Sequence, residues 1–134
     1  MADTQTTPQT VTRDAADLLV ETLNTIEGLP FVRDAWENKA PANYGVVELD
    51  GQADALWADN RMLEQVFRLT VHLYVDGSRD DLVATVQGKL GTACDGYSLP
   101  THEFLFDAGK THWAWQCVII GPLQWDEVVP DGAQ

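Results

Sequence analysis

Three histidines and two cysteines are the side chains of this sequence that could bind a metal ion or act as nucleophiles. Imidazole nitrogen and thiolate sulfur are the usual ligands of zinc. The spacing argues against a zinc site, because the sequence contains no CxxC, HxxxH or HExxH motif. We therefore expect no metal and no cofactor, and we interpret these side chains as solvated or packed. They are His72, His102, His112, Cys94 and Cys117.

The local sequence also gives no support for catalysis by a thiol or by paired carboxylates. Cys94 has no recognisable nucleophile motif around it, and a small half-buried thiol is the commoner role for such a cysteine. The neighbouring acids Asp80 and Asp81 are explained better by the positive end of a helix than by acid–base chemistry. A glycine-rich phosphate loop is absent from the sequence. We predict that the protein is not an enzyme.

Negative charge is the dominant property of the composition. The 134 residues include 21 acidic and 8 basic side chains, for a formal charge of −13, while 45% of the residues are hydrophobic. That much apolar material is sufficient for a packed core, so we expect the acids to lie on a folded surface. A surface of this sign repels nucleic acid and anionic membranes, and it favours basic partners or a role in which DNA passes without binding.

The chain is expected to form one domain between two polar ends. Residues 1–11 are predicted to be a flexible arm, residues 12–121 a single α+β domain, and residues 122–134 a tail whose prolines interrupt any regular element. The apolar run Cys117–Ile120 is far too short to span a membrane. Free thiols and a polar N-terminus indicate an intracellular protein.

Two helices are predicted from apolar periodicity. The first begins at Thr12 as N-cap and continues with apolar residues at three- and four-residue steps. Gly28 and Pro30 end it. The second runs from about Arg79 to Leu90 and ends at Gly91. Ser78 and the acid three residues later predict a capping box at its start.

The middle of the sequence is predicted to hold strands separated by a loop. Phe31–Trp36 is a short strand or an extended connector, and Tyr44–Leu49 is a strand that Asp50 and Gly51 close as a turn. Gln52–Asn60 has no clean period and is expected to be a long exposed loop. Met62–Val75 alternates strictly, which predicts a strand longer than one compact domain needs.

The last third of the sequence predicts a hairpin of His102–Phe106 and Thr111–Ile120. With a short link from the long strand into the second helix, the economical architecture is α+β. We expect a mostly antiparallel sheet of four to five strands with both helices packed on one face.

The aromatic residues are candidates for the core or for an interface. Trp113 and Trp115 alternate on a strand, which is typical of a core or a sheet face. Trp36, Trp57 and Trp125 lie outside the strongest elements, where aromatic residues are typical of interfaces. We expect subunit contacts to involve Trp57, Tyr74, Trp113 and Trp125.

Several segments together resemble the small tail terminator and tail completion proteins of long-tailed bacteriophages. They are a polar arm, an early amphipathic helix ending at Gly28, the segment Pro41–Val47, the long strand Glu64–Tyr74, the helix Asp80–Leu90 and the closing hairpin with the sequence HWAW. The resemblance covers about residues 12–121 and rests on size, element order and the pattern of proline, aromatic residue and valine strand.

The resemblance implies a non-enzymatic subunit of the virion tail, assembled in the host cytoplasm. Such proteins form hexameric rings on the last ring of the tail tube, stop tube growth and face the head connector. The expected partners are further copies of this chain, the tail tube protein, the head–tail connector protein and DNA that passes without specific binding. Acids facing the lumen would repel DNA phosphates, and the expected lumen residues are Asp54 and Asp59 in the loop after Asp50.

Two other classes of function fit the same composition. One is a small α+β enzyme or ligand-binding domain with a pocket between sheet and helices. The other is an acidic inhibitor that mimics DNA and binds a basic nucleic-acid enzyme. Oligomeric state separates these two classes from a tail terminator, because only the tail terminator requires a ring.

Overall fold

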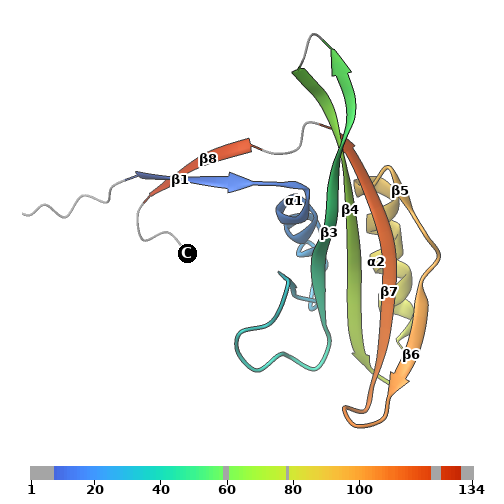
Figure 1. The fold of residues 1–134 in the computed structure, drawn as a ribbon. Coiled ribbons are helices and arrows are strands. Elements are labelled where there is room, and N and C mark those ends of the chain that lie inside the picture. The colour runs from blue at the N-terminus through green and yellow to red at the C-terminus, as the bar shows by residue number, and fades with distance from the viewer. Residues whose placement is uncertain (1–7, 59–60, 78, 122–124, 131–134) are drawn as a thin grey trace, which may run out of the picture.

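The protein is an α+β fold in which two helices pack on one face of a mixed, mostly antiparallel sheet (Figure 1). The computed structural model describes residues 8–58, 61–77, 79–121 and 125–130. Its elements in chain order are β1 (Pro8–Arg13), α1 (Ala15–Leu23), β2 (Phe31–Arg33), β3 (Tyr44–Ala58), β4 (Arg61–Asp76), α2 (Asp80–Ala93), β5 (Gly96–Tyr97), β6 (Thr101–Leu105), β7 (Lys110–Gly121) and β8 (Trp125–Pro130).

The central sheet has six strands in the order β2-β3-β4-β7-β5, and β6 pairs with β7 beside β5. Among the strands that the structure describes, β2 and β3 are the one parallel pair. This confirms the predicted class and the mostly antiparallel sheet, with one or two strands more than expected. The alternation read in residues 62–75 is β4, which pairs with β3 on one side and with β7 on the other.

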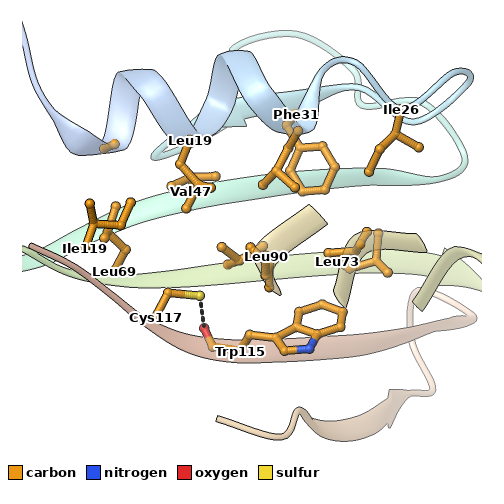
Figure 2. Close-up of a cluster of buried hydrophobic side chains, with 14 of the residues drawn as sticks. Leu19, Ile26, Phe31, Val47, Leu69, Leu73, Leu90, Trp115, Cys117 and Ile119 are labelled. Atoms are coloured by element: carbon orange, nitrogen blue, oxygen red, sulfur yellow. Dashed lines mark hydrogen bonds between the residues drawn. The ribbon is translucent and has the colours of Figure 1, made fainter. Parts of the chain in front are cut away.

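Strict alternation in β4 determines which face of the sheet is the core. Phe67, Leu69, Val71, Leu73 and Val75 are all buried and belong to the same core cluster as residues of both helices. Figure 2 shows Leu19 of α1 and Leu90 of α2 meeting inward side chains that include Val47, Leu69 and Trp115. The opposite face of the sheet, which we call the open face, is covered by neither helix.

Helix α1 begins two residues later than predicted. Thr12 belongs to β1, and the N-cap is Asp14, whose carboxylate accepts from the backbone N–H groups of Ala16 and Asp17. The Asp17 carboxylate accepts in return from the Asp14 N–H, which completes a capping box. Arg33 of β2 then donates to both carboxylates at 2.9–3.1 Å and ties the helix to the sheet.

Helix α2 differs from the prediction at both ends. Its N-cap is Arg79, which makes no side-chain capping bond, and Ser78 lies outside the described residues. The expected capping box, which requires the Ser78 side chain, therefore stays a prediction. The helix also continues through Gly91 to Ala93, because Leu90 packs into the core and the last turn bonds to the backbone N–H of Cys94.

The predicted loop Gln52–Asn60 is wrong, because residues 52–58 continue strand β3. Asp50 and Gly51 form a bulge in place of a turn, and the pairing of β3 with β4 resumes beyond it to Ala58 and Arg61. Strand β7 pairs with β4 only from Gln65 onward. Residues 55–58 and 61–64 thus extend from the sheet as a two-stranded ribbon, the long ribbon (Figure 1).

The two ends of the chain form a second ribbon, which neither end was expected to do. Strands β1 and β8 pair from Pro8 with Pro130 to Arg13 with Trp125. This terminal ribbon reaches away from the central sheet (Figure 1). Residues 8–11 are therefore not an arm without structure, and Pro130 of the tail is the last residue of strand β8. The predictions for residues 1–7, 122–124 and 131–134 lie outside the described part.

Candidate functional site

The open face carries a row of aromatic and ionisable side chains across four strands. Tyr44 of β3 lies opposite Tyr74 of β4, Tyr74 lies opposite His112 of β7, and His112 lies opposite Glu103 of β6. The antiparallel register therefore brings together residues that are up to 68 positions apart in the sequence. Cross-strand neighbours on one face are close enough for direct side-chain contact.

The rings of this row form a continuous stack. Tyr44 and Tyr74 stack with centroids 4.9 Å apart, and Tyr74 and His112 stack at 4.5 Å with planes only 6° apart. Trp36, in the loop between β2 and β3, meets Tyr44 edge-on at 5.8 Å and 76°. Such contacts fix ring orientation, so the walls of the site are set before any ligand arrives.

His72 connects the stack to a carboxylate. Its Nε2 is hydrogen-bonded to Oε1 of Glu48, and its Nδ1 lies 2.7 Å from Nε2 of His112. An ionised Glu48 can only accept, so His72 carries its proton on Nε2 and accepts at Nδ1 from His112. This assignment leaves the unprotonated Nδ1 of His112 facing Glu103, whose Oε1 is 3.7 Å away.

The row therefore has a defined place for one additional proton, on Nδ1 of His112. Burial is the main reason that the pKa of His112 is lowered, and the neighbouring His72 lowers it further. Glu103 and Glu48 act in the opposite direction. Burial also raises the pKa of Tyr74, with smaller contributions from Tyr44 and the two glutamates. The lowered pKa favours the neutral form of His112.

We expect stability to depend on pH through His112. Its pKa is lower in the folded protein than in the unfolded chain, so the unfolded chain binds the proton first as pH falls below about 6.5. Acidification from pH 7.5 to 5.5 should therefore lower the free energy of unfolding of the wild type more than that of His112→Gln. Urea unfolding of both proteins across this range measures the difference. Both proteins contain the same carboxylates, so the contribution of these groups to the pH dependence cancels in the comparison. Parallel pH profiles would contradict the assignment.

A hollow of about 390 Å³ opens beside this row. The loop after β2 forms one wall and the open face forms the floor. Its lining is Asp34, Ala35, Trp36, Tyr44, Val46, Glu48, His72 and Tyr74. Two carboxylates and three aromatic rings thus share one small concavity, a composition suited to binding a cation.

The loop that forms the wall is fastened to the sheet at several points. The Trp36 indole donates to the Gly45 carbonyl at 3.3 Å, and the Asp34 N–H donates to the Val47 carbonyl at 3.0 Å. Asp34 has φ 68°, a conformation that aspartate tolerates better than most residues. At the far end, Lys110 donates to the Ala42 carbonyl and forms an ion pair with an acid of β4 at 2.8 Å.

Sequence reasoning placed His72 on the polar face of its strand but missed the site. The available signal was the repetition of aromatic, histidine and acidic residues at alternate positions of three strands, namely Tyr44 and Glu48, His72 and Tyr74, and His112. Only the strand register shows that these positions coincide.

The two thiols lie on the other face of the sheet, away from this histidine pair. Cys117 is buried in β7, and Cys94 follows α2 directly. A hydrogen bond between them raises the pKa of Cys117, and the same bond lowers the pKa of Cys94.

The third histidine, His102, stacks on Trp113 with ring centroids 4.6 Å apart. Within the described residues, no group of three or more His, Cys, Asp or Glu side chains is arranged to hold a metal ion.

The expected interface residues have different surroundings. Tyr74 is half-buried in the aromatic stack, whereas Trp113 packs against the core on the helix face. Trp57 lies on the long ribbon, Asp54 lies in β3 just before it and Trp125 lies in β8, but their side chains are outside the described part, as is Asp59. The expected lumen and the expected interface therefore stay predictions.

Large apolar side chains are exposed at the tip of the β6–β7 hairpin. Phe106 is 86% exposed, Phe104 is 46% exposed, and their rings meet edge to face at 4.9 Å. Leu99, just before β6, is 79% exposed. In the part of the chain that the structure describes, β6 pairs only with β7, so its outer edge has unpaired backbone groups.

Among the described helices, none has both the length and the apolar composition required to cross a bilayer. No protein-family model matches the sequence, and no curated protein matches it either.

Proposed function

We propose that the chain is a structural, non-enzymatic subunit that assembles with further copies of itself into a closed ring. In its specific form, the proposal is a tail terminator-like ring at the head-proximal end of a bacteriophage tail tube, where it stops tube growth and joins the head connector. That specific form rests on the resemblance in element order and segment pattern. The hexameric number, the tube and connector partners and the virion location rest on it as well.

The observation that carries the proposal of assembly is the pair of projecting ribbons. An isolated two-stranded ribbon is marginally stable in water, and three strands or packing on another element are needed for independent stability. The long ribbon extends beyond the strands that flank it, and the terminal ribbon reaches away from the sheet. A neighbouring subunit would supply the missing contacts to both.

Two further features support assembly. The exposed Phe104 and Phe106 stand beside the unpaired outer edge of β6, which is a template for another strand. Because the sheet has a second edge at β2, contacts between unlike edges can repeat around an axis and close into a ring. The charge of −13 suits a ring through which DNA passes, since phosphates are repelled from its surface.

A ligand-binding domain is the second candidate, and the aromatic hollow beside Glu48 favours it. A protein of that class would stay monomeric at all concentrations and would not need either ribbon. A DNA-mimic inhibitor would also need no ring, and it would bind a basic enzyme with strong salt dependence.

Shortening the long ribbon tests the assembly proposal. Asp54 and Gln65 are cross-strand partners, so an Asn-Gly turn can join them in place of residues 55–64. We expect this variant to keep its secondary structure but to lose the oligomer, as measured by sedimentation velocity at several protein concentrations. The wild type should sediment as a discrete oligomer that is favoured by salt, because salt screens the repulsion between acidic subunits.

The matched control places the same Asn-Gly turn at the original tip, as Asp59→Asn with Asn60→Gly. Ala58 and Arg61 are partners there, so the ribbon keeps its length. This control should assemble like the wild type. A shortened variant that assembles as well as the control would remove the ribbon from the interface and would overturn this part of the proposal.

A further inference from the structure

We infer that the hollow between the β2–β3 loop and the open face binds a guanidinium group, presented by an arginine side chain of a basic partner protein. The inference goes beyond ring assembly and does not require it. It rests on the aromatic walls of the hollow and on the half-exposed carboxylate of Glu48, which has no lysine or arginine partner among the described residues.

The walls provide flat π surfaces at a fixed angle. Trp36 and Tyr44 are inclined by 76°, with centroids 5.8 Å apart, and Tyr74 continues the floor from Tyr44. Because Tyr74 is stacked between Tyr44 and His112, a planar cation would lie against Trp36 while the other two rings exclude water from its edges. A cation within about 6 Å of an aromatic ring centroid is attracted by the ring quadrupole.

Glu48 provides the main counter-charge. Its side chain is 47% exposed, and it uses Oε1 to accept from His72. The second oxygen, and a further lone pair on Oε1, are available to N–H donors that enter the hollow. Asp34 lines the same hollow with a side chain that is 71% exposed. Two carboxylates at one concavity favour a cation over a neutral or anionic ligand.

The cations that lie nearest to the hollow are held by other groups. Arg33 donates to Asp14 and Asp17 and also forms a longer ion pair with Asp34, at 3.8 Å, so Asp34 is already partly compensated. Lys110 is paired with Asp76, and its ammonium lies 5.9 Å from the centroid of the Tyr44 ring. Of the described residues that line the hollow, His72 alone is basic, and its ring already bonds Glu48 and His112. The Glu48 carboxylate is therefore available to bind a cation from outside the chain.

The shape of the hollow favours guanidinium over ammonium. Guanidinium is planar, weakly hydrated and able to stack on an aromatic face while its N–H fork bonds a carboxylate. Lysine ammonium is compact and strongly hydrated, and it offers no flat surface to Trp36 or Tyr44. The hollow is also formed in advance, because the Trp36 indole and the Asp34 backbone are both bonded to β3. Little ordering is then required on binding.

A peptide titration followed by NMR tests the inference. The probe is the capped tripeptide Gly-Arg-Gly, and the comparison peptides carry citrulline, a neutral analogue of similar shape, or lysine in place of arginine. The signal is the indole N–H resonance of Trp36, assigned by its loss in Trp36→Phe. The matched variants are Glu48→Gln and, as control, Glu21→Gln, which removes an exposed acid from α1.

We expect saturable shifts of the Trp36 indole resonance with the arginine peptide, for the wild type and for Glu21→Gln alike. Glu48→Gln should bind about five-fold more weakly or worse, and so should the citrulline peptide to the wild type, because a charge-assisted bond is lost in each case. The lysine peptide should bind more weakly than the arginine peptide. Equal binding by Glu48→Gln and Glu21→Gln would overturn the site, and equal binding of arginine and lysine peptides would overturn the choice of guanidinium.

Discussion

Trp115→Ala should lower the free energy of unfolding by about 3 to 5 kcal/mol, the range for truncating a large aromatic side chain in a packed core. Trp115 is completely buried in β7, where Val86 and Leu90 of α2 belong to the same cluster. Its indole donates to the side chain of Gln87 at 3.2 Å, so the substitution removes a hydrogen bond as well as the ring. Urea unfolding measures the loss.

Two variants give this prediction its controls. Trp115→Phe keeps most of the buried ring and removes the bond to Gln87, so its loss should be clearly smaller. Gln116→Ala changes the next residue of β7, whose side chain is exposed, and should shift stability by less than about 0.5 kcal/mol. A loss below about 1 kcal/mol for Trp115→Ala would show that α2 does not cover this part of the sheet.

Gly45→Ala should destabilise the protein by about 3 kcal/mol, at the upper end of the usual cost of overpacking. Gly45 lies beside Phe31 in the parallel pairing of β2 and β3. An added Cβ would lie 2.6 Å from Cζ of the Phe31 ring and closer still to two other ring carbons. That ring is almost completely buried, so it can move only by disturbing the core under α1. Thermal and urea unfolding measure the effect.

Gly88 provides the matched control, because a Cβ added there meets no atom within 4 Å. It lies on the exposed side of α2, and Gly88→Ala should stabilise the protein by about 0.5 to 1 kcal/mol through helix propensity. If Gly45→Ala left the free energy of unfolding unchanged, β2 would not pack against β3 as described.

The elements that the sequence predicted well are those with a local signal. The alternation of β4, from Leu63 to Val75, identifies both the strand and its buried face without any knowledge of its partners. The β6–β7 hairpin is similarly marked by a turn sequence ending at Lys110 between two alternating runs. In both cases a period of two and turn residues are sufficient.

The errors occur where distant pairing overrides a local signal. Asp50 and Gly51 are typical turn residues, but here Asp50 accepts a hydrogen bond from Thr70 across the sheet and the strand continues past a bulge. Strands β1 and β8 are about 110 residues apart in the chain, and the local sequence of neither segment predicts that they pair. The candidate site was missed for the same reason, because only the register brings Tyr44, Tyr74 and His112 side by side.

Electron microscopy of the wild-type protein tests the central claim, that this chain is a ring-forming subunit, most directly. The protein would be concentrated at high salt and imaged in negative stain, and its mass would be measured in parallel by light scattering. We expect closed rings of uniform diameter and a mass that is an integer multiple of 14.8 kDa. A single species of one-chain mass at every salt and protein concentration, with no rings in the images, would contradict it.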